Sequence, residues 1–315
     1  MTDSLRVDVI VNRVAHHLVK GGALRDALVG AAGRGARVLE TRSLAELDEA
    51  VATIAARGTD RVVLAGGDGS YTAGVTALGR AMPDAMPVIA FAPGGTVSTV
   101  ARNWGMRGRG RRAAERVVER ALDPATPLLA RPSLRVRDGG GGDRVGFIFG
   151  AGLVASFFDV YYAAPEQGYA SAAGITARVF AGSFVGGALA RRVLAPTPAE
   201  LSIDGVRQEP RAWSLVVASV VKDLGLHMHV TYRAGERFDR FHTVASALDA
   251  RALGPQMARV LAGRRLVGAH HVDTLAGEIA LRFASPRGAY ILDGDPFVAT
   301  DVRVTAGPAL RVLAA

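Results

Sequence analysis

The first 130 residues alternate short apolar runs with longer segments in which apolar residues recur at helical spacing. The runs have the length of buried strands, and we place strands at Val7–Val11, Val38–Leu39, Val62–Ala65 and Val88–Ala92. Before the third run, Ser43 is a predicted helix N-cap, Glu46 completes a capping box, and Gly58 ends the helix. Buried strands joined by helices predict a parallel α/β sheet in residues 1–130.

After residue 130 the apolar runs become short and are separated by turns. Asp-Gly pairs at Asp204 and Asp293 predict tight hairpins, and Asp138–Gly142 predicts another turn. We expect strands at Leu134–Val136, Val145–Phe149, Leu215–Val221, Ile279–Phe283 and Tyr290–Leu292, with helices near Tyr169–Leu194 and Leu253–Leu261. The predicted fold class is α/β plus β, in which the second domain is antiparallel and resembles a β-sandwich.

The composition is that of a globular protein: 49% of the 315 residues are hydrophobic and 21% are charged. The chain has no cysteine, which excludes disulfides and thiolate metal sites. We interpret the N-terminus as a first strand, not a secretory signal, and find no apolar run of membrane-spanning length. We therefore expect a soluble, cytoplasmic protein.

The formal net charge of +9 favours anionic partners, such as nucleotides or acidic lipid surfaces. One group of arginines stands out, and it is either a solvated helix face or an anion-binding surface: Arg102, Arg107, Arg109, Arg111, Arg112, Arg116 and Arg120. No nucleic-acid-binding signature accompanies it, so no nucleic acid is expected. Peripheral contact with an anionic membrane, at its inner face, is expected if the arginines bind lipid.

The strongest chemical signal is Gly66-Gly67-Asp68-Gly69-Ser70, which directly follows a predicted buried strand. Glycines let the backbone approach an anion closely and adopt positive φ, and amides at the start of a helix, expected at Ser70, favour phosphate. An acid such as Asp68 beside phosphates is explained if it handles magnesium or polarises a hydroxyl. An ordinary strand-to-helix turn is the alternative.

A second loop, Pro93-Gly94-Gly95-Thr96, repeats this pattern one unit later, with Thr96 as the expected helix N-cap. Two neighbouring strand ends with glycine-rich loops form one crevice at the carboxyl edge of an α/β sheet, which is where such sheets bind ligands. The two loops together therefore predict a phosphate-binding site. The chain has no Walker lysine motif, which argues against P-loop NTPases.

These motifs resemble the catalytic domain of the diacylglycerol kinase family, which includes bacterial lipid kinases and sphingosine kinases. The resemblance rests on Gly66–Ser70, on Pro93–Thr96 followed by Ala101-Arg102, and on Leu292–Pro296, which is similar to the family's Asp-Gly-Glu motif. It implies a nucleotide-binding kinase domain at 1–130, a β-rich acceptor-binding domain at 131–295 and a C-terminal segment, 296–315, that returns to the first domain. It also implies ATP and Mg²⁺ as cofactors and a lipid substrate; a homodimer is left open.

Carried over by position, the resemblance implies three groups of site residues. The nucleotide would contact Asn12, Thr41, Gly66, Gly67, Asp68, Gly69, Ser70, Tyr71, Thr72, Gly94, Gly95 and Thr96. Asp295 would accept the proton from the acceptor hydroxyl, with Asp68 as the second catalytic residue. A structural magnesium ion would be held by the loop at Asp239 and Phe241, with Asp239 as the side-chain ligand.

The chain departs from the family at several of these positions. Ser98-Thr99 stands where the family has Asn-Asp, which removes a carboxylate, and Asp295 is one methylene shorter than the family's glutamate. From the residues alone, Asp293-Gly294-Asp295 is predicted to form a hairpin turn, and only the resemblance implies that Asp295 is a base. His227 and His229 would share one strand face, and we interpret them as ordinary surface or core histidines, with a metal-binding pair as the alternative.

The predicted activity is phosphoryl transfer from ATP to a hydroxyl of a diacylglycerol-like or sphingoid lipid. The segment Phe180–Phe184 would line an acyl-chain cleft or belong to the core. A soluble-metabolite kinase of the phosphofructokinase or NAD kinase type is the first alternative, since Gly-Gly-Asp-Gly-Ser also occurs there. A nucleotide-binding regulator that has lost catalysis is the second, and the missing carboxylate at Thr99 supports it.

Overall fold

The computed structural model describes residues 5–15, 22–33, 35–94, 98–106, 108 and 110–314. The chain divides into an N-terminal unit, residues 1–131 with 309–315, and a C-terminal unit, residues 132–308. Residues 296–308, which we expected in the returning segment, belong to the C-terminal unit because their strands pair with its sheets.

A six-stranded sheet forms the centre of the N-terminal unit, in the order β2-β1-β3-β4-β19-β5. Its strands are β1 (Val7–Asn12), β2 (Ala36–Thr41), β3 (Arg61–Gly66), β4 (Val88–Pro93), β5 (Leu128–Arg131) and β19 (Leu310–Leu313). All neighbouring strands pair in parallel except β19 and β5, which pair antiparallel. The predicted parallel α/β sheet is therefore confirmed.

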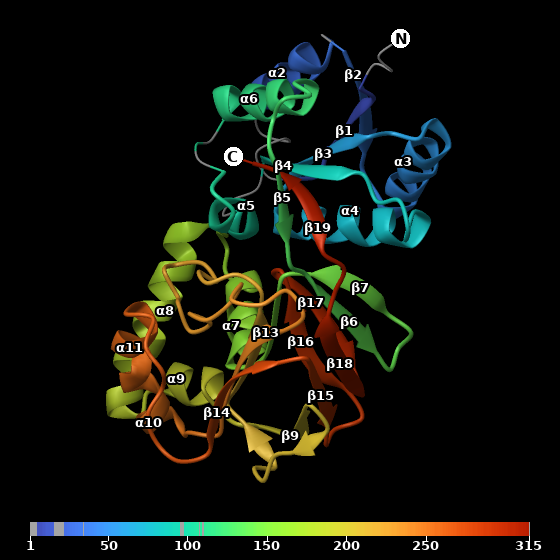
Figure 1. The fold of residues 1–315 in the computed structure, drawn as a ribbon. Helices are drawn as coiled ribbons and strands as arrows, with labels where there is room; N and C mark the ends of the chain where they lie inside the picture. The colour runs from blue at the N-terminus through green and yellow to red at the C-terminus, as the bar shows by residue number, and fades with distance from the viewer. Residues whose placement is uncertain are drawn as a thin grey trace. The chain divides into compact units, whose positions relative to one another are not determined.

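Helices cover both faces of this sheet (Figure 1). On one face, α2 (Gly22–Ala32) and α6 (Arg111–Leu122) bury their apolar side chains against alternate residues of β1, β3 and β4. On the other lie α3 (Leu44–Arg57) and α4 (Asp68–Ala81), and the short α5 (Thr99–Asn103) follows β4. Both sides of the central strands are thus buried, which explains their uninterrupted apolar runs.

Helix α3 shows how local sequence sets an element's ends. Ser43 is its N-cap, and the Ser43 hydroxyl accepts the amide of Glu46 at 3.1 Å, as predicted. The carboxylate of Glu46 accepts the amide of Arg42, not that of Ser43, so only half of the predicted capping box forms. Gly58 ends the helix with a φ of 63°, a conformation that glycine adopts without a Cβ penalty.

The strand order reverses between β1 and β3. From β1 the chain first adds β2 on one side and then crosses over to add β3 and β4 on the other side. Such a switch point opens a crevice at the carboxyl ends of the strands, where open α/β sheets bind ligands. Asn12 and Gly66, the last residues of β1 and β3, lie at this point.

Two antiparallel sheets form the C-terminal unit, as predicted. One has the order β10-β9-β15-β18-β6-β7, with β11 paired to β9, and contains β6 (Leu134–Asp138), β7 (Asp143–Gly146), β9 (Thr197–Ile203), β10 (Val206–Arg207), β11 (Ala212–Trp213), β15 (Glu278–Phe283) and β18 (Asp301–Ala306). The other has the order β14-β13-β12-β8-β16-β17 and contains β8 (Ile148–Gly152), β12 (Leu215–Ser219), β13 (Phe241–Ser246), β14 (His271–Ala276), β16 (Gly288–Leu292) and β17 (Asp295–Ala299).

The helices of this unit are α7 (Leu153–Tyr162), α8 (Tyr169–Val185), α9 (Ala188–Val193), α10 (Ala250–Leu253), η1 (Gly254–Gln256) and α11 (Met257–Leu261). Both predicted helical regions form helices, whereas α7 was not predicted. Among the described residues, no helix combines the length and the apolar character needed to cross a membrane.

The predicted single strand Val145–Phe149 is wrong. The chain leaves one sheet after Gly146 and enters the other at Ile148. The carboxylate of Asp293 accepts the amides of Phe147 at 3.0 Å and Ile148 at 2.8 Å, and so supplies the acceptors at the break. A continuous apolar run conceals this change of sheet.

Candidate nucleotide-binding site

Three strand ends are joined at the carboxyl edge of the N-terminal sheet. The side-chain amide of Asn12 donates to Ser70 Oγ at 2.8 Å, and the backbone amide of Gly67 donates to the same oxygen at 3.3 Å. The amide of Gly94, just after β4, donates to the carbonyl of Gly66 at 2.8 Å. The structure thus brings five of the predicted nucleotide-binding residues together at the switch point.

Gly66 is the position where this arrangement requires glycine. A Cβ there would lie 2.4 Å from Ser70 Oγ and 3.6 Å from the Cβ of Asn12. The expectation that these glycines adopt positive φ is wrong: Gly66, Gly67 and Gly69 are not among the described residues with positive φ. Gly67 has a φ of −99° and a ψ of −175°, which any residue can adopt. Glycine here permits close approach of atoms.

Helix α4 begins two residues earlier than we predicted. Gly67 is its N-cap and Asp68 is its first residue. The carboxylate of Asp68 accepts two backbone amides of the second loop, those of Thr99 at 2.8 Å and Val100 at 3.0 Å. Asp68 therefore fastens the first glycine loop to the first turn of α5.

The charge state of Asp68 is set by opposing influences. Burial raises the pKa of the Asp68 carboxyl, whereas the amide hydrogen bonds from Thr99 and Val100 and the nearby cation of Arg102 act to lower it. The carboxylate has about four lone-pair sites, and the two amides and the Thr99 hydroxyl do not use all of them. The group can therefore still face a cation.

Tyr71 and Thr72, both predicted to contact the nucleotide, have buried side chains. The ring of Tyr71 is fully buried, with its centroid 4.4 Å from that of Phe91, so it packs between α4 and β4. Burial raises the pKa of Tyr71, and the charge of Asp68 acts in the same direction. These two side chains pack against the sheet and so support the loop, because their positions on the helix turn them toward the sheet.

The sheet places one further predicted nucleotide contact, Thr41, next to this cluster. Thr41 ends β2, is buried, and is the strand partner of Asn12. Gly95 and Thr96 lie outside the described residues. Ser98, not Thr96, is the N-cap of α5, and its φ of 50° is uncommon for a non-glycine residue.

Asp295, the predicted base, is the first residue of β17 in the C-terminal unit and is exposed. Its strand partner is Leu292, so Asp293 and Gly294 form a two-residue turn with φ values of 51° and 96°. Both values are positive, as in the predicted hairpin turn. Asp295 therefore stands at the end of a tight two-residue hairpin.

A tyrosine that the sequence analysis missed lies beside Asp295. The hydroxyl of Tyr162, at the end of α7, donates to the carbonyl of Gly294 at 2.8 Å. Burial raises the pKa of Tyr162 to about 12, and the charge of Asp295 acts in the same direction. No local pattern signals this neighbour, because the two residues are far apart in the chain and α7 was not predicted.

The loop predicted to hold magnesium contains an ion pair. Asp239 is exposed and forms a two-fold ion pair with Arg237, in which both N–O distances are 2.8 Å. The side chain of Phe241 is fully buried in β13. In the part of the chain that the structure describes, the one metal-competent group of three side chains lies elsewhere and does not include Asp239. The magnesium role of this loop stays a prediction.

The comparison with known protein families matches the same segment. Residues 6–128, which carry both glycine loops, match the diacylglycerol kinase catalytic domain. Over this segment the chain is similar to that family. The resemblance that we drew from Gly66–Ser70 and Pro93–Thr96 is thereby confirmed. No protein of curated function matches the chain.

Solved structures extend the similarity of fold to the whole chain. A diacylglycerol kinase from Bacillus anthracis str. Sterne is 15% identical, with a TM-score of 0.64 over 100% of this chain and 98% of that chain. Two structures of a candidate diacylglycerol kinase from the same strain are 14% and 15% identical, each with a TM-score of 0.70 over 100% of this chain and 99% of that chain. At this identity they show a shared fold.

Proposed function

We propose that the protein is an ATP-dependent lipid kinase that phosphorylates a hydroxyl of a diacylglycerol-like or sphingoid lipid. The observation that carries this proposal is the glycine-rich loop at the β1–β3 switch point, inside the segment that matches the kinase domain. A switch point predicts where a ligand binds, and the loop predicts that the ligand has phosphates.

In this proposal Ser70 and the loop backbone hold phosphate oxygens. Ser70 Oγ accepts hydrogen bonds from Asn12 and Gly67, so its own proton is directed to a further acceptor. The start of α4 adds backbone amides and the positive end of a helix dipole. Both features favour an anion over a neutral ligand. ATP would supply the phosphoryl group, and Mg²⁺ would neutralise charge on its oxygens.

The presence of Asp68 in a phosphate-binding site indicates that the site also binds a cation. A carboxylate beside phosphate groups repels them unless a cation lies between them or the carboxyl is protonated. Oxygen ligands are those that Mg²⁺ prefers, and Asp68 retains a lone pair beyond those that accept Thr99 and Val100. We assign Asp68 both tasks: it positions the second loop and it faces Mg²⁺.

Asp295 is proposed to accept the proton of the acceptor hydroxyl. This role rests on the family motif at Leu292–Pro296. The structure supports it in one respect: the carboxylate is exposed at the end of a hairpin whose turn does not depend on it. A base must reach the proton that it abstracts, and an exposed carboxylate on a hydrogen-bonded hairpin meets that need.

Apolar side chains exposed on α7 and α8 support a lipid acceptor. Tyr162, Tyr169, Phe184 and Val185 are 41%, 43%, 57% and 81% exposed. The segment Phe180–Phe184, expected either to line an acyl-chain cleft or to belong to the core, contains residues of both kinds. Ser183 is fully buried, and its Oγ would lie 1.8 Å from a Cβ at Gly254, so it belongs to the core. Phe184 faces outward, and exposed apolar groups of this kind favour contact with a lipid.

Phosphate transfer from labelled ATP to lipids in vesicles tests the proposal. We expect labelled diacylglycerol or sphingoid base, and more product in anionic than in neutral vesicles, because the arginines of α6 at 111, 112, 116 and 120 are exposed. Labelled polyprenol would change the acceptor class. Labelling of a soluble alcohol alone would favour the metabolite-kinase alternative, and no transfer with tight ATP binding would favour the regulator.

Binding of ATP is tested separately. ATP with magnesium is expected to raise the melting temperature, because a ligand that binds only the folded state stabilises it. Gly67→Val is expected to remove this shift, because its backbone conformation admits a side chain but the branched group blocks phosphate approach.

Gly30→Val is the matched control for this measurement. Gly30 is exposed on α2, and a Cβ there meets no atom within 4 Å. The control should keep the full ATP-dependent shift. An unchanged shift in Gly67→Val, measured at the same ATP concentration, would remove the first loop from the nucleotide site.

A further inference from the structure

The connection between β12 and β13 runs from Val220 to Arg240 without a helix or strand. Structureless connections of this length are uncommon in compact domains and usually have a function. Here the chain contains three successive residues of positive φ, Gly225 at 101°, Leu226 at 53° and His227 at 57°. Leucine and histidine in this region are conformationally costly, so surrounding contacts must hold the loop in place.

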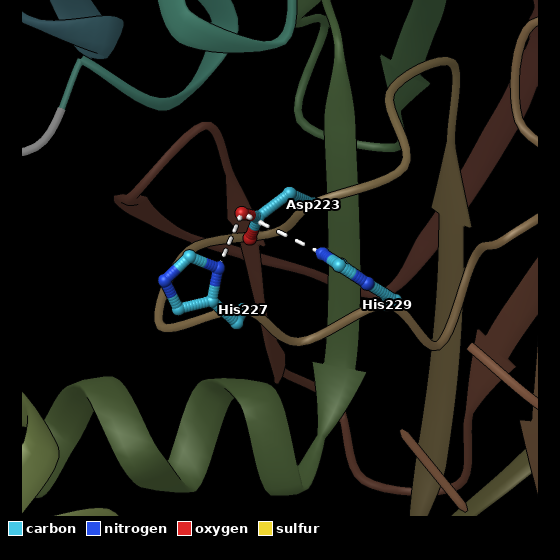
Figure 2. A group of neighbouring side chains, drawn as sticks. All are labelled: Asp223, His227 and His229. Atoms are coloured by element: carbon cyan, nitrogen blue, oxygen red, sulfur yellow. Dashed lines mark ion pairs between the residues drawn. The ribbon is translucent and has the colours of Figure 1, made fainter. Parts of the chain in front are cut away.

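This turn brings together three side chains that can bind a metal ion: Asp223, His227 and His229 (Figure 2). Our expectation that the two histidines share a strand face is wrong, because the chain forms no strand there. Asp223 Oδ2 lies 3.6 Å from His227 Nδ1 and 3.7 Å from His229 Nε2. All three ligand atoms lie within 4.8 Å of one another.

These distances are close to those of an occupied zinc site. Bonds of about 2.0–2.1 Å at tetrahedral angles place any two ligand atoms roughly 3.3–3.5 Å apart. The two Asp–His separations exceed this by a few tenths of an ångström. His227 is 78% exposed, so its ring can rotate to make up the difference.

The surrounding contacts hold two of the three ligands in place. Asp223 Oδ1 accepts the amide of Gly225 at 2.8 Å, which directs Oδ2 toward the histidines. Leu224 and Val230, next to Asp223 and His229 in sequence, pack into the apolar core of the C-terminal unit. The amide of His229 donates to the carbonyl of Val260 at 3.2 Å. Hydrogen-bonded ligands on anchored backbone are typical of protein metal sites.

We propose that Asp223, His227 and His229 form a binding site for zinc or a closely related divalent transition-metal ion, with water in the fourth position. Two imidazoles and one carboxylate suit such an ion, whereas magnesium prefers oxygen ligands. The exposure of His227 makes the ion exchangeable. Occupancy cross-links the two ends of the strained turn and fastens the β12–β13 connection.

Zinc titration of the full-length, tag-free, metal-free protein tests this site. We expect one zinc ion per chain, a higher melting temperature with zinc, and no competition from a large excess of magnesium. His227→Asn is the informative variant, because asparagine tolerates the left-handed backbone of this position while removing the imidazole. It and His229→Gln are expected to weaken zinc binding by more than about 10-fold, the lower range seen when even outer contacts of a metal are lost.

His270→Asn is the matched control. His270 is also exposed, lies in the same unit and has a φ of 55°, so the same substitution carries the same backbone demand. It should bind zinc as the unmodified protein does. Absence of saturable zinc binding, or equal affinity in all three variants, would overturn the proposal and leave an Asp–His ion-pair cluster. Neither measurement uses ATP or lipid, so the outcome is independent of the proposed kinase activity.

Discussion

Asp68→Ala is expected to reduce lipid phosphorylation to the background rate. The variant removes the acceptor of the amides of Thr99 and Val100 and also the carboxylate proposed to face magnesium. Leaving a buried donor unsatisfied costs about 1–3 kcal/mol, so the melting temperature should fall as well. Loss of the magnesium contact should lower the turnover of the folded protein by roughly 10²–10³-fold or more, as when other charge-stabilising groups are removed.

A control variant that lowers stability without touching the site can separate the loss of stability from the loss of catalysis. Ser43→Ala removes the N-cap of α3 in the same unit, where Ser43 Oγ accepts the amide of Glu46. Loss of such a cap costs about 0.5–2 kcal/mol. This control should lower the melting temperature, but it should keep the unmodified protein's turnover at assay temperatures below that melting temperature. Asp68→Asn is the third variant to compare, because it preserves the shape of the side chain and one acceptor oxygen but removes the negative charge.

Turnover and melting temperature of the three variants then decide between the roles of Asp68. Near-normal turnover in Asp68→Asn, with loss in Asp68→Ala, would leave Asp68 as a positioning residue for the second loop. Wild-type turnover in a folded Asp68→Ala protein would contradict both roles. A loss in Ser43→Ala as large as that in Asp68→Ala would attribute the effect to stability.

Local patterns predicted the parts of the fold that local physics determines. Uninterrupted apolar runs marked β3 and β4, because strands buried on both faces have no polar alternation. Asp293-Gly294 marked its hairpin, because few residue pairs accept positive φ twice. Glycine at Gly66 has a different cause, which is steric: a Cβ there would lie 2.4 Å from Ser70 Oγ.

Contacts between distant segments were beyond local patterns. Asp68 was expected at a ligand, yet its carboxylate binds amides 31 and 32 residues further along the chain. The group around Asp223 depends on a left-handed turn at Leu226 and His227, residues whose identity does not indicate positive φ. Helix α7 was missed because Leu153–Tyr162 is mostly apolar and aromatic, a composition equally typical of a strand.

Asp295→Asn is expected to slow lipid phosphorylation by roughly 10²–10⁴-fold, the usual contribution of a general base, because an amide cannot accept the proton. The hairpin should stay intact, since its turn is formed by Asp293 and Gly294. An exposed substitution of this kind changes stability by no more than about 0.5 kcal/mol. ATP binding should not change, because the glycine loops belong to the N-terminal unit.

Two further variants show whether the carboxylate itself is responsible. Glu209→Gln removes the charge of another exposed acid in the C-terminal unit and should keep the full rate. Asp295→Glu restores the family's residue and extends the carboxylate by one methylene. A lower rate in Asp295→Glu would show a site matched to the shorter acid, and a higher rate would show one that the native residue serves imperfectly. Wild-type turnover in Asp295→Asn, with labelled lipid as the product, would remove Asp295 from the mechanism and leave Asp68 as the remaining candidate base.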